Sequence, residues 1–301
     1  MRRVELAGVV ALCCWAGSGW ALAAAWPSAV PFGLAQVVHF GLITAVALLV
    51  ARVRGSERPS GGSGARRRLE LAGVGVMLFA VPALVLEWSR RGVPAYTEAE
   101  IFAGIPLVMA VLAAVGAEAA GEDGLGQAIV PGLMGLGGVL LLFPVHLPGS
   151  VRGTEAFVAV IVCAVVVAWG CLQIRSLLEG AWGAVWIAVA NLVVFGLALL
   201  FGGDETGGWP GMGAVGMELA RGAVFDLPVV LGTIWLMGRV DPERLSARFL
   251  LAPLVTVVGG YAAEPGPVEA RTIAAVGLIA VGGVWVLLKR KTVGAVSILS
   301  E

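Results

Sequence analysis

Ten apolar stretches of bilayer length follow one another along this chain of 301 residues, separated by short segments rich in Gly, Pro and charge. A helix rises about 1.5 Å per residue, so roughly 20 apolar residues cross the hydrocarbon core of a membrane. We therefore predict an all-α integral membrane protein with ten transmembrane helices. The predicted helices are Leu6 to Ala25, Val30 to Ala51, Leu69 to Trp88, Ala99 to Ala117, Ala128 to Val145, Ala156 to Ile174, Ala181 to Phe201, Leu219 to Gly238, Ala247 to Ala263 and Thr272 to Leu288.

Composition supports this reading and argues against several others. Apolar residues make up 59% of the chain and charged residues only 13%, whereas about a quarter of a soluble domain is charged. The formal net charge of zero argues against nucleic acid as a partner. The four cysteines lie inside apolar stretches without the spacing of a metal or redox motif, so we interpret them as packing residues and predict no metal site. A lipid bilayer is the expected surrounding.

The N-terminal stretch has two interpretations. Two arginines, an apolar run and small residues at Ala23 to Ala25 also fit a secretory signal peptide. The run from Leu6 to Ala25 is long enough to span a bilayer, and its removal would leave the internal repeat described below incomplete. We favour a first transmembrane helix.

Orientation follows from the arginines and lysines, which are retained on the cytoplasmic side of membranes. Alternate loops and both termini carry 15 of the 20 basic residues, six of them between Arg52 and Arg68. This Gly/Ser-rich segment, Ala51 to Arg68, is predicted to be a flexible loop. Both termini of this multi-pass protein are therefore predicted to be cytoplasmic.

The chain contains an internal repeat. The segment from Trp88 to Val108 matches that from Trp235 to Val255 at an offset of 147 residues, and the pattern GxxxxGGV at Gly132 returns at Gly277, 145 residues later. We predict two five-helix repeats, residues 1–147 and 148–301. Five is an odd number, so the copies face opposite ways across the membrane, which suits alternating access. The alternative is a duplication that only builds a larger protein.

Three features recur in both halves, and with them the chain resembles the EamA-type drug/metabolite transporters, the DMT superfamily. They are a Trp in the first helix, a fourth helix that opens on Pro and ends on Glu, and a Gly-rich fifth helix. The matching residues are Trp15 and Trp169, Pro106 to Glu118 and Pro253 to Glu264, and the segments from Gly132 and Gly277. A polar loop around Glu98 and Glu100 departs from the pattern.

The resemblance implies a ten-helix carrier of the bacterial cytoplasmic (inner) membrane without a cofactor. Its central cavity would be lined by the first, third, fourth, sixth, eighth and ninth helices. Members of the family carry amino acids, other metabolites or drugs, so the resemblance leaves the solute open. Trp15 and Trp169 would line the cavity. Trp20, in the same first helix, is a further aromatic candidate. Packing between helices is the alternative role for these tryptophans.

Ionisable side chains are costly near the bilayer centre and therefore informative. Asp226 lies about 12 Å along its helix from Glu218, close to the expected midplane, and Pro228 should loosen the helix beside it. Asp226 could bind a substrate ammonium or carry a proton. The alternative is a carboxyl group that serves packing alone.

Two further polar residues lie near the middle of their helices. His39 in the second helix could respond to pH, although a structural hydrogen bond, with Gln36 as one candidate, is the simpler interpretation. Asn191 lies in the seventh helix, the repeat equivalent of the second, and has the same alternatives.

Other residues are assigned structural roles. Pro106 and Pro253 are predicted to break or pack helices, and Gly138 and Gly283 to allow close helix packing. Glu218 and Arg221, three residues apart, are predicted to pair at the outer face. Glu118 and Glu264 are predicted to anchor loops.

These observations favour a secondary transporter, most simply an exporter of amino acids or similar small metabolites, and not an enzyme. The chain has no GxxxxGK phosphate-binding loop, so ATP is not the direct drive. The alternatives are a membrane-embedded enzyme acting on lipid-type substrates, and a scramblase or structural protein. The expected partner is a small-molecule solute, and the sequence allows a monomer or a homodimer.

Overall fold

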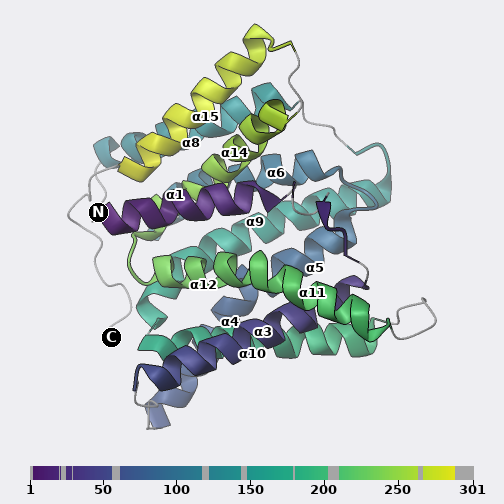
Figure 1. Ribbon diagram of the computed structural model, residues 1–301. Coiled ribbons are helices and arrows are strands. Elements are labelled where there is room, and N and C mark those ends of the chain that lie inside the picture. The colour runs from purple at the N-terminus through teal and green to yellow at the C-terminus, as the bar shows by residue number, and fades with distance from the viewer. Residues whose placement is uncertain are drawn as a thin grey trace. The chain divides into compact units, whose positions relative to one another are not determined.

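A computed structural model describes residues 3–19, 21, 25–28, 30–55, 62–116, 122–143, 148–178, 180–202, 210–263 and 267–288. Within these ranges the chain is helical and has no β-strand (Figure 1). The helices are α1 (Arg3–Gly17), α3 (Phe32–Val53), α4 (Gly62–Leu78), α5 (Ala80–Ser89), α6 (Ala95–Ala103), α7 (Ile105–Gly116), α8 (Glu122–Leu142), α9 (Val151–Leu177), α10 (Gly180–Phe201), α11 (Met212–Val224), α12 (Asp226–Met237), α13 (Pro242–Leu245), α14 (Arg248–Ala263) and α15 (Ala270–Leu288).

Eight helical stretches among the described residues are long and apolar enough to cross a membrane, so the chain is a multi-pass membrane protein by length and composition. Helix α1 and the apolar stretch Ile129–Leu142 are shorter than this limit as described. The predicted number of ten remains a prediction. The eight stretches are Phe32–Val53, Gly64–Ser89, Ala95–Val115, Val151–Leu177, Gly180–Phe201, Met212–Met237, Pro242–Ala263 and Ala270–Leu288.

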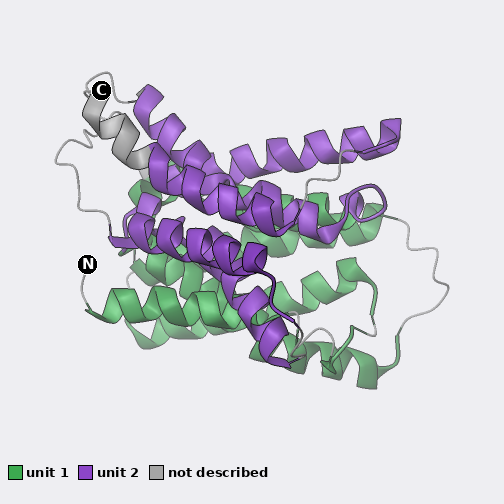
Figure 2. Ribbon diagram, turned by 90° about the horizontal axis from the view of Figure 1, so that it is seen from above, with its two compact units in different colours: residues 1–87, 173–239 green, residues 88–172, 240–301 purple. Residues whose placement is uncertain are grey.

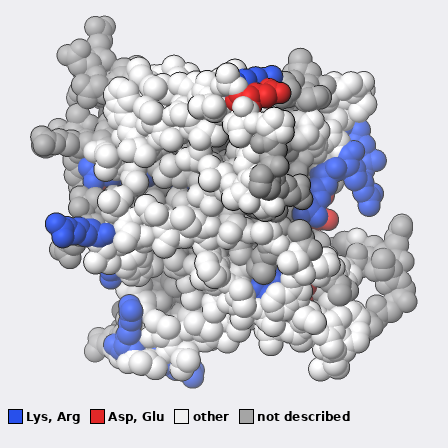
Figure 3. All heavy atoms as spheres, turned by 45° about the horizontal axis from the view of Figure 1, so that its top comes forward, with Lys and Arg blue, Asp and Glu red and all other residues white. Residues whose placement is uncertain are grey.

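The exposed side of helix α9 indicates that lipid, and not water, surrounds the chain. Val160, Val167 and Ile174 on one side are buried, whereas Val162 and Trp169 on the opposite side are 55% and 49% exposed. Both sides are apolar, whereas a helix at the surface of a soluble protein has one polar side. Most atoms on the face in Figure 3 likewise belong to uncharged residues. Lipid is the environment that suits such a surface.

Two of the membrane-spanning stretches are interrupted at a phenylalanine near their middle. Helix α4 stops before Phe79 and α5 continues the stretch, and α11 stops before Phe225, where α12 takes over. Both breaks carry the pattern Phe-x-x-Pro, and Phe79 and Phe225 are 146 residues apart, as are Pro82 and Pro228. Proline has no backbone N–H, so each break leaves a carbonyl without its helical donor.

The chain forms two compact units (Figure 2): unit 1 comprises residues 1–87 and 173–239, and unit 2 residues 88–172 and 240–301. Each unit combines a segment of the first predicted repeat with a segment of the second. In unit 1, α3 packs against α10, α11 and α12, α4 packs against α10, and α1 packs against α12. Unit 1 therefore surrounds the break between α11 and α12 with helices from far earlier in the sequence.

Unit 2 is built around the pair α8 and α15, which approach closely at glycines. A methyl group on Gly138 would lie 2.8 Å from the carbonyl oxygen of Ala275, and one on Gly283 would lie 2.8 Å from the Leu251 side chain. No larger residue fits at Gly138 without moving the backbone of α15. The structure thus gives both glycines the packing role expected from the sequence.

The segment predicted as a polar loop is instead a buried helix. The fourth spanning stretch begins at Ala95, not Ala99, and the side chains of Glu98 and Glu100 are 9% and 2% exposed within α6. Glu98 accepts a hydrogen bond from the Ser89 hydroxyl. A hydropathy criterion excludes these carboxylates, but a polar partner such as the Ser89 hydroxyl lets Glu98 lie inside the unit.

The two prolines expected to open helices lie inside spanning stretches. Pro106 is the second residue of α7, directly after the interruption at Gly104 between α6 and α7. Pro253 lies within α14, which continues through it. The spans begin earlier than predicted, at Ala95 and Pro242.

The end of the predicted flexible loop is helical. Helix α4 begins at Gly62, so three arginines expected in the loop lie on its first turns. Arg67 donates a hydrogen bond to the carbonyl of Ser176, and the guanidinium of Arg68 lies 5.5 Å from the centre of the Trp186 ring. These contacts hold the arginines of α4 against α9 and α10.

Candidate functional site

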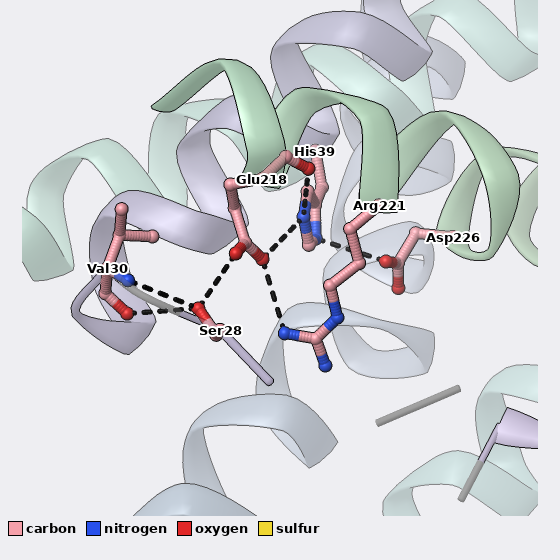
Figure 4. Close-up of polar contacts among 6 residues, drawn as sticks. All are labelled: Ser28, Val30, His39, Glu218, Arg221 and Asp226. Atoms are coloured by element: carbon pink, nitrogen blue, oxygen red, sulfur yellow. Dashed lines mark hydrogen bonds and ion pairs between the residues drawn. The ribbon is translucent and has the colours of Figure 1, made fainter. Parts of the chain in front are cut away.

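A cluster of ionisable side chains lies in unit 1 at the break between α11 and α12 (Figure 4). Glu218 lies on α11, Asp226 is the first residue of α12, and His39 reaches them from α3. Glu218 and Asp226 are eight residues apart, a spacing that brings side chains to one side of a helix. Asp226 lies near the middle of the 26-residue span Met212–Met237.

The imidazole of His39 lies between the two carboxylates. Its Nε2 is 3.0 Å from Oε1 of Glu218 and 3.2 Å from the backbone carbonyl oxygen of the same residue. Its Nδ1 is 3.1 Å from Oδ2 of Asp226, at ion-pair distance but without the alignment of a hydrogen bond. His39 is 4% exposed, Glu218 2% and Asp226 31%. Asp226 is thus the accessible member of the triad formed by these three residues.

Gly222 makes room for the histidine. A methyl group at this position would lie 2.4 Å from Cδ2 of the His39 ring and 3.1 Å from Nε2. The absence of a side chain on this turn of α11 therefore allows the ring to approach the helix and reach Glu218.

Two more groups hold Glu218. The hydroxyl of Ser28, which precedes α3, donates a hydrogen bond of 2.8 Å to Oε2. The guanidinium of Arg221 lies 3.4 Å from Oε1. The pairing of Glu218 with Arg221 was predicted from the sequence, and in the structure Glu218 is buried, six residues after the span begins at Met212.

Few other charges are near the triad. Helix α10, which also packs against α3, carries no titratable side chain, and α11 and α12 carry only the groups already named. Arg52 on α3 is 13 residues, about 20 Å, from His39. Arg3 and Glu5 lie at the start of α1, ten or more residues before Trp15. The local balance is therefore two carboxylates, one guanidinium and one imidazole.

Trp15 meets the helix break itself. Its indole N–H donates a hydrogen bond of 3.1 Å to the carbonyl of Val224, the residue four positions before Pro228. This carbonyl is the one that lacks a helical donor because of Pro228. Trp15 therefore supports the break through its N–H, while its side chain remains 45% exposed.

Asn191 does not belong to the triad. It is fully buried on α10 and donates hydrogen bonds to the carbonyls of Gly75, at 3.2 Å, and Ile187, at 2.8 Å. These contacts fit the structural role weighed for it. On α10 a different residue packs against a glycine, as His39 does against Gly222. This residue is Ile187, which lies one turn before Asn191 and contacts Gly75.

The remaining predicted residues have other places. Trp169 lies in unit 2 on the exposed side of α9. Trp20, Glu118 and Glu264 lie outside the described residues. The partners of His39 are on α11 and α12, not the neighbouring Gln36 suggested by the sequence. Sequence reasoning missed Glu218 as a site residue, although its spacing from Asp226 was a usable signal.

The triad does not resemble a metal site. Within the described ranges no group of three or more His, Cys, Asp or Glu residues is arranged to hold a metal ion. In the triad, the two imidazole nitrogens face two different carboxylates, so the three groups do not converge on one point. The arrangement suits proton sharing and the binding of positive charge.

Comparisons with known proteins show a fold shared with a solved structure and add no activity. No protein-family model matches the chain, and no curated protein matches it. A solved structure described only as the crystal structure of a protein superimposes with a TM-score of 0.73 at 18% identity, over 96% of this chain and 99% of that chain. This likeness shows a shared fold over nearly the full length.

Proposed function

We propose that this protein is a secondary transporter of the bacterial cytoplasmic membrane that exports amino acids or similar small metabolites. The observation that carries the proposal is the triad of His39, Glu218 and Asp226, which lies at a break in a membrane-spanning helix of unit 1. Ionisable groups at this depth are costly and mark substrate or ion pathways by default.

The helix break strengthens the proposal. Secondary transporters bind solutes near the bilayer midplane at discontinuous helices, where freed backbone groups and polar side chains meet. Here the interruption before Asp226 lies near the middle of its span, and Trp15 occupies the carbonyl that Pro228 leaves free.

The paired breaks support an inverted repeat and alternating access. Phe79 and Phe225 begin the same Phe-x-x-Pro pattern at an offset of 146 residues, which falls within the series of offsets from 145 to 147 in the sequence repeat. Two five-helix repeats, 1–147 and 148–301, would face opposite ways, with both termini cytoplasmic. The resemblance to EamA-type transporters leads to the same class of protein.

A comparison of cells tests the proposal. Cells that produce the wild-type protein are expected to lose a set of small metabolites to the medium, whereas cells that produce Asp226→Asn retain them. Glu70→Gln is the matched control, because this carboxylate of unit 1 is 46% exposed and pairs with Arg66. Identical intracellular and extracellular metabolite profiles for wild type and Asp226→Asn would contradict transport; an altered lipid profile would favour the enzyme or scramblase.

A further inference from the structure

The proton count of the triad is informative. A neutral imidazole has one N–H and one lone pair, whereas an ionised carboxylate only accepts hydrogen bonds. In the structure both ring nitrogens of His39 lie about 3 Å from carboxylate oxygens, of Glu218 and of Asp226. Nε2 has the carbonyl of Glu218 as its hydrogen-bond acceptor, so without an extra proton the unprotonated Nδ1 would lie 3.1 Å from a carboxylate oxygen of Asp226, a repulsive contact that a proton on either group relieves. The geometry therefore fits a triad that holds one extra proton, in addition to the single N–H of a neutral imidazole beside two ionised carboxylates.

The charge balance agrees with the proton count. With neutral His39, two carboxylates face one guanidinium, that of Arg221, and the cluster carries one negative charge in excess. One added proton makes it neutral. Because an uncompensated charge inside a membrane protein is costly, we expect the cluster to hold one positive charge in addition to Arg221, either a proton or a bound cation.

We propose that His39, Glu218 and Asp226 bind one exchangeable proton, and that an organic solute of charge +1 displaces it. This inference rests on the proposed transport function and narrows its substrate class to small organic cations. The only bonds exchanged are those of a proton transfer: an N–H or O–H bond of the triad breaks, water on the open side takes the proton as hydronium, and the solute cation takes its place against the carboxylates. Each cycle moves one proton against one cation and is electroneutral.

Asp226 is the group that meets the solute. It is 31% exposed, whereas His39 and Glu218 are almost completely enclosed. The exposed ring of Trp15 is held at the same helix break, through the carbonyl of Val224 two residues before Asp226. A carboxylate with an aromatic ring nearby is an arrangement that favours ammonium groups.

The first experiment measures protons without requiring transport. Tetramethylammonium, choline and amino-acid methyl esters are added to the solubilised full-length protein in weak buffer with a pH-indicator dye, and binding is measured in parallel. Wild type is expected to release about one proton for each cation bound, a number set by the charge count above. Glu70→Gln should do the same, and Asp226→Asn and Glu218→Gln should release none. Binding without proton release, or no binding of any cation, would overturn the proposal.

The second experiment uses the same protein in liposomes with an acidic lumen and an entrapped pH dye. External choline or tetramethylammonium is expected to speed loss of the pH gradient, at a rate that a clamped membrane potential does not change. Solute exchange without proton flux would overturn the coupling and leave transport intact. Proton release in solution without any flux in liposomes would support the proton site and contradict the transport function.

Discussion

Gly222 offers a way to disturb the triad without removing a charged group. In Gly222→Ala the new methyl carbon would lie 2.4 Å from Cδ2 of His39, whereas carbon atoms in contact are normally about 3.5 to 4.0 Å apart. The ring must therefore retreat by about 1 Å or more. The ion-pair contacts of 3.0 Å to Glu218 and 3.1 Å to Asp226 would then lengthen and weaken.

We expect Gly222→Ala to lower the free energy of unfolding by about 1–3 kcal/mol, the usual cost of overpacking. The matched control is Gly216→Ala on the same helix, where nothing lies within 4 Å of the added carbon. This control should be stabilising by about 0.5–1 kcal/mol because alanine favours the helix. Thermal unfolding can be followed with a thiol-reactive dye, since Cys13 and Cys163 are buried.

A double-mutant cycle isolates the contact with the ring. In a His39→Ala background the methyl group at Gly222 meets no imidazole, so the destabilisation should fall by about 1 kcal/mol or more. If Gly222→Ala lowered the free energy of unfolding equally in both backgrounds, the packing of His39 on Gly222 would be refuted. A cost for Gly216→Ala as large as for Gly222→Ala would refute it as well.

Three further outcomes follow from the contacts in unit 1. Trp15→Phe should lower the free energy of unfolding by about 1–3 kcal/mol, because it leaves the Val224 carbonyl unpaired. The loss should be much smaller in a Pro228→Ala background, which restores a helical donor for this carbonyl. Equal thermal shifts in both backgrounds would argue against this hydrogen bond. Asn191→Leu should destabilise by about 1 kcal/mol, yet leave the solute exchange rate per folded molecule unchanged, which initial rates in liposomes can check. Gly75→Ala should destabilise too, because its added methyl group would lie 2.9 Å from Ile187, and an unchanged melting temperature would contradict that packing.

The membrane class could be predicted from sequence, but helix limits at polar residues could not. Hydropathy marks a long apolar run well, as for Val30 to Ala51, which the structure describes as Phe32–Val53. It fails where a carboxylate is buried with partners, and so the start of the fourth span was set after Glu98 instead of at Ala95. Partners from other helices decide whether a charged residue lies inside, and a single apolar window does not contain them.

The site could be predicted in part. Asp226 stood out because a carboxylate near the middle of an apolar helix is costly, and the structure gives it His39 as a partner. Glu218 was assigned to the helix start, although its spacing of eight residues from Asp226 indicated a shared side. The contact of His39 with α11 depends on packing between segments 179 residues apart, which no local pattern encodes.

The most direct test of the central claim is solute counterflow in proteoliposomes, with a panel of labelled organic cations and neutral metabolites. The account predicts that wild type exchanges one or more of the cations and that Asp226→Asn reduces this exchange to the rate of protein-free liposomes, while Glu70→Gln retains it. Exchange by Asp226→Asn at the wild-type rate, or no exchange of any solute by folded wild type, would contradict it.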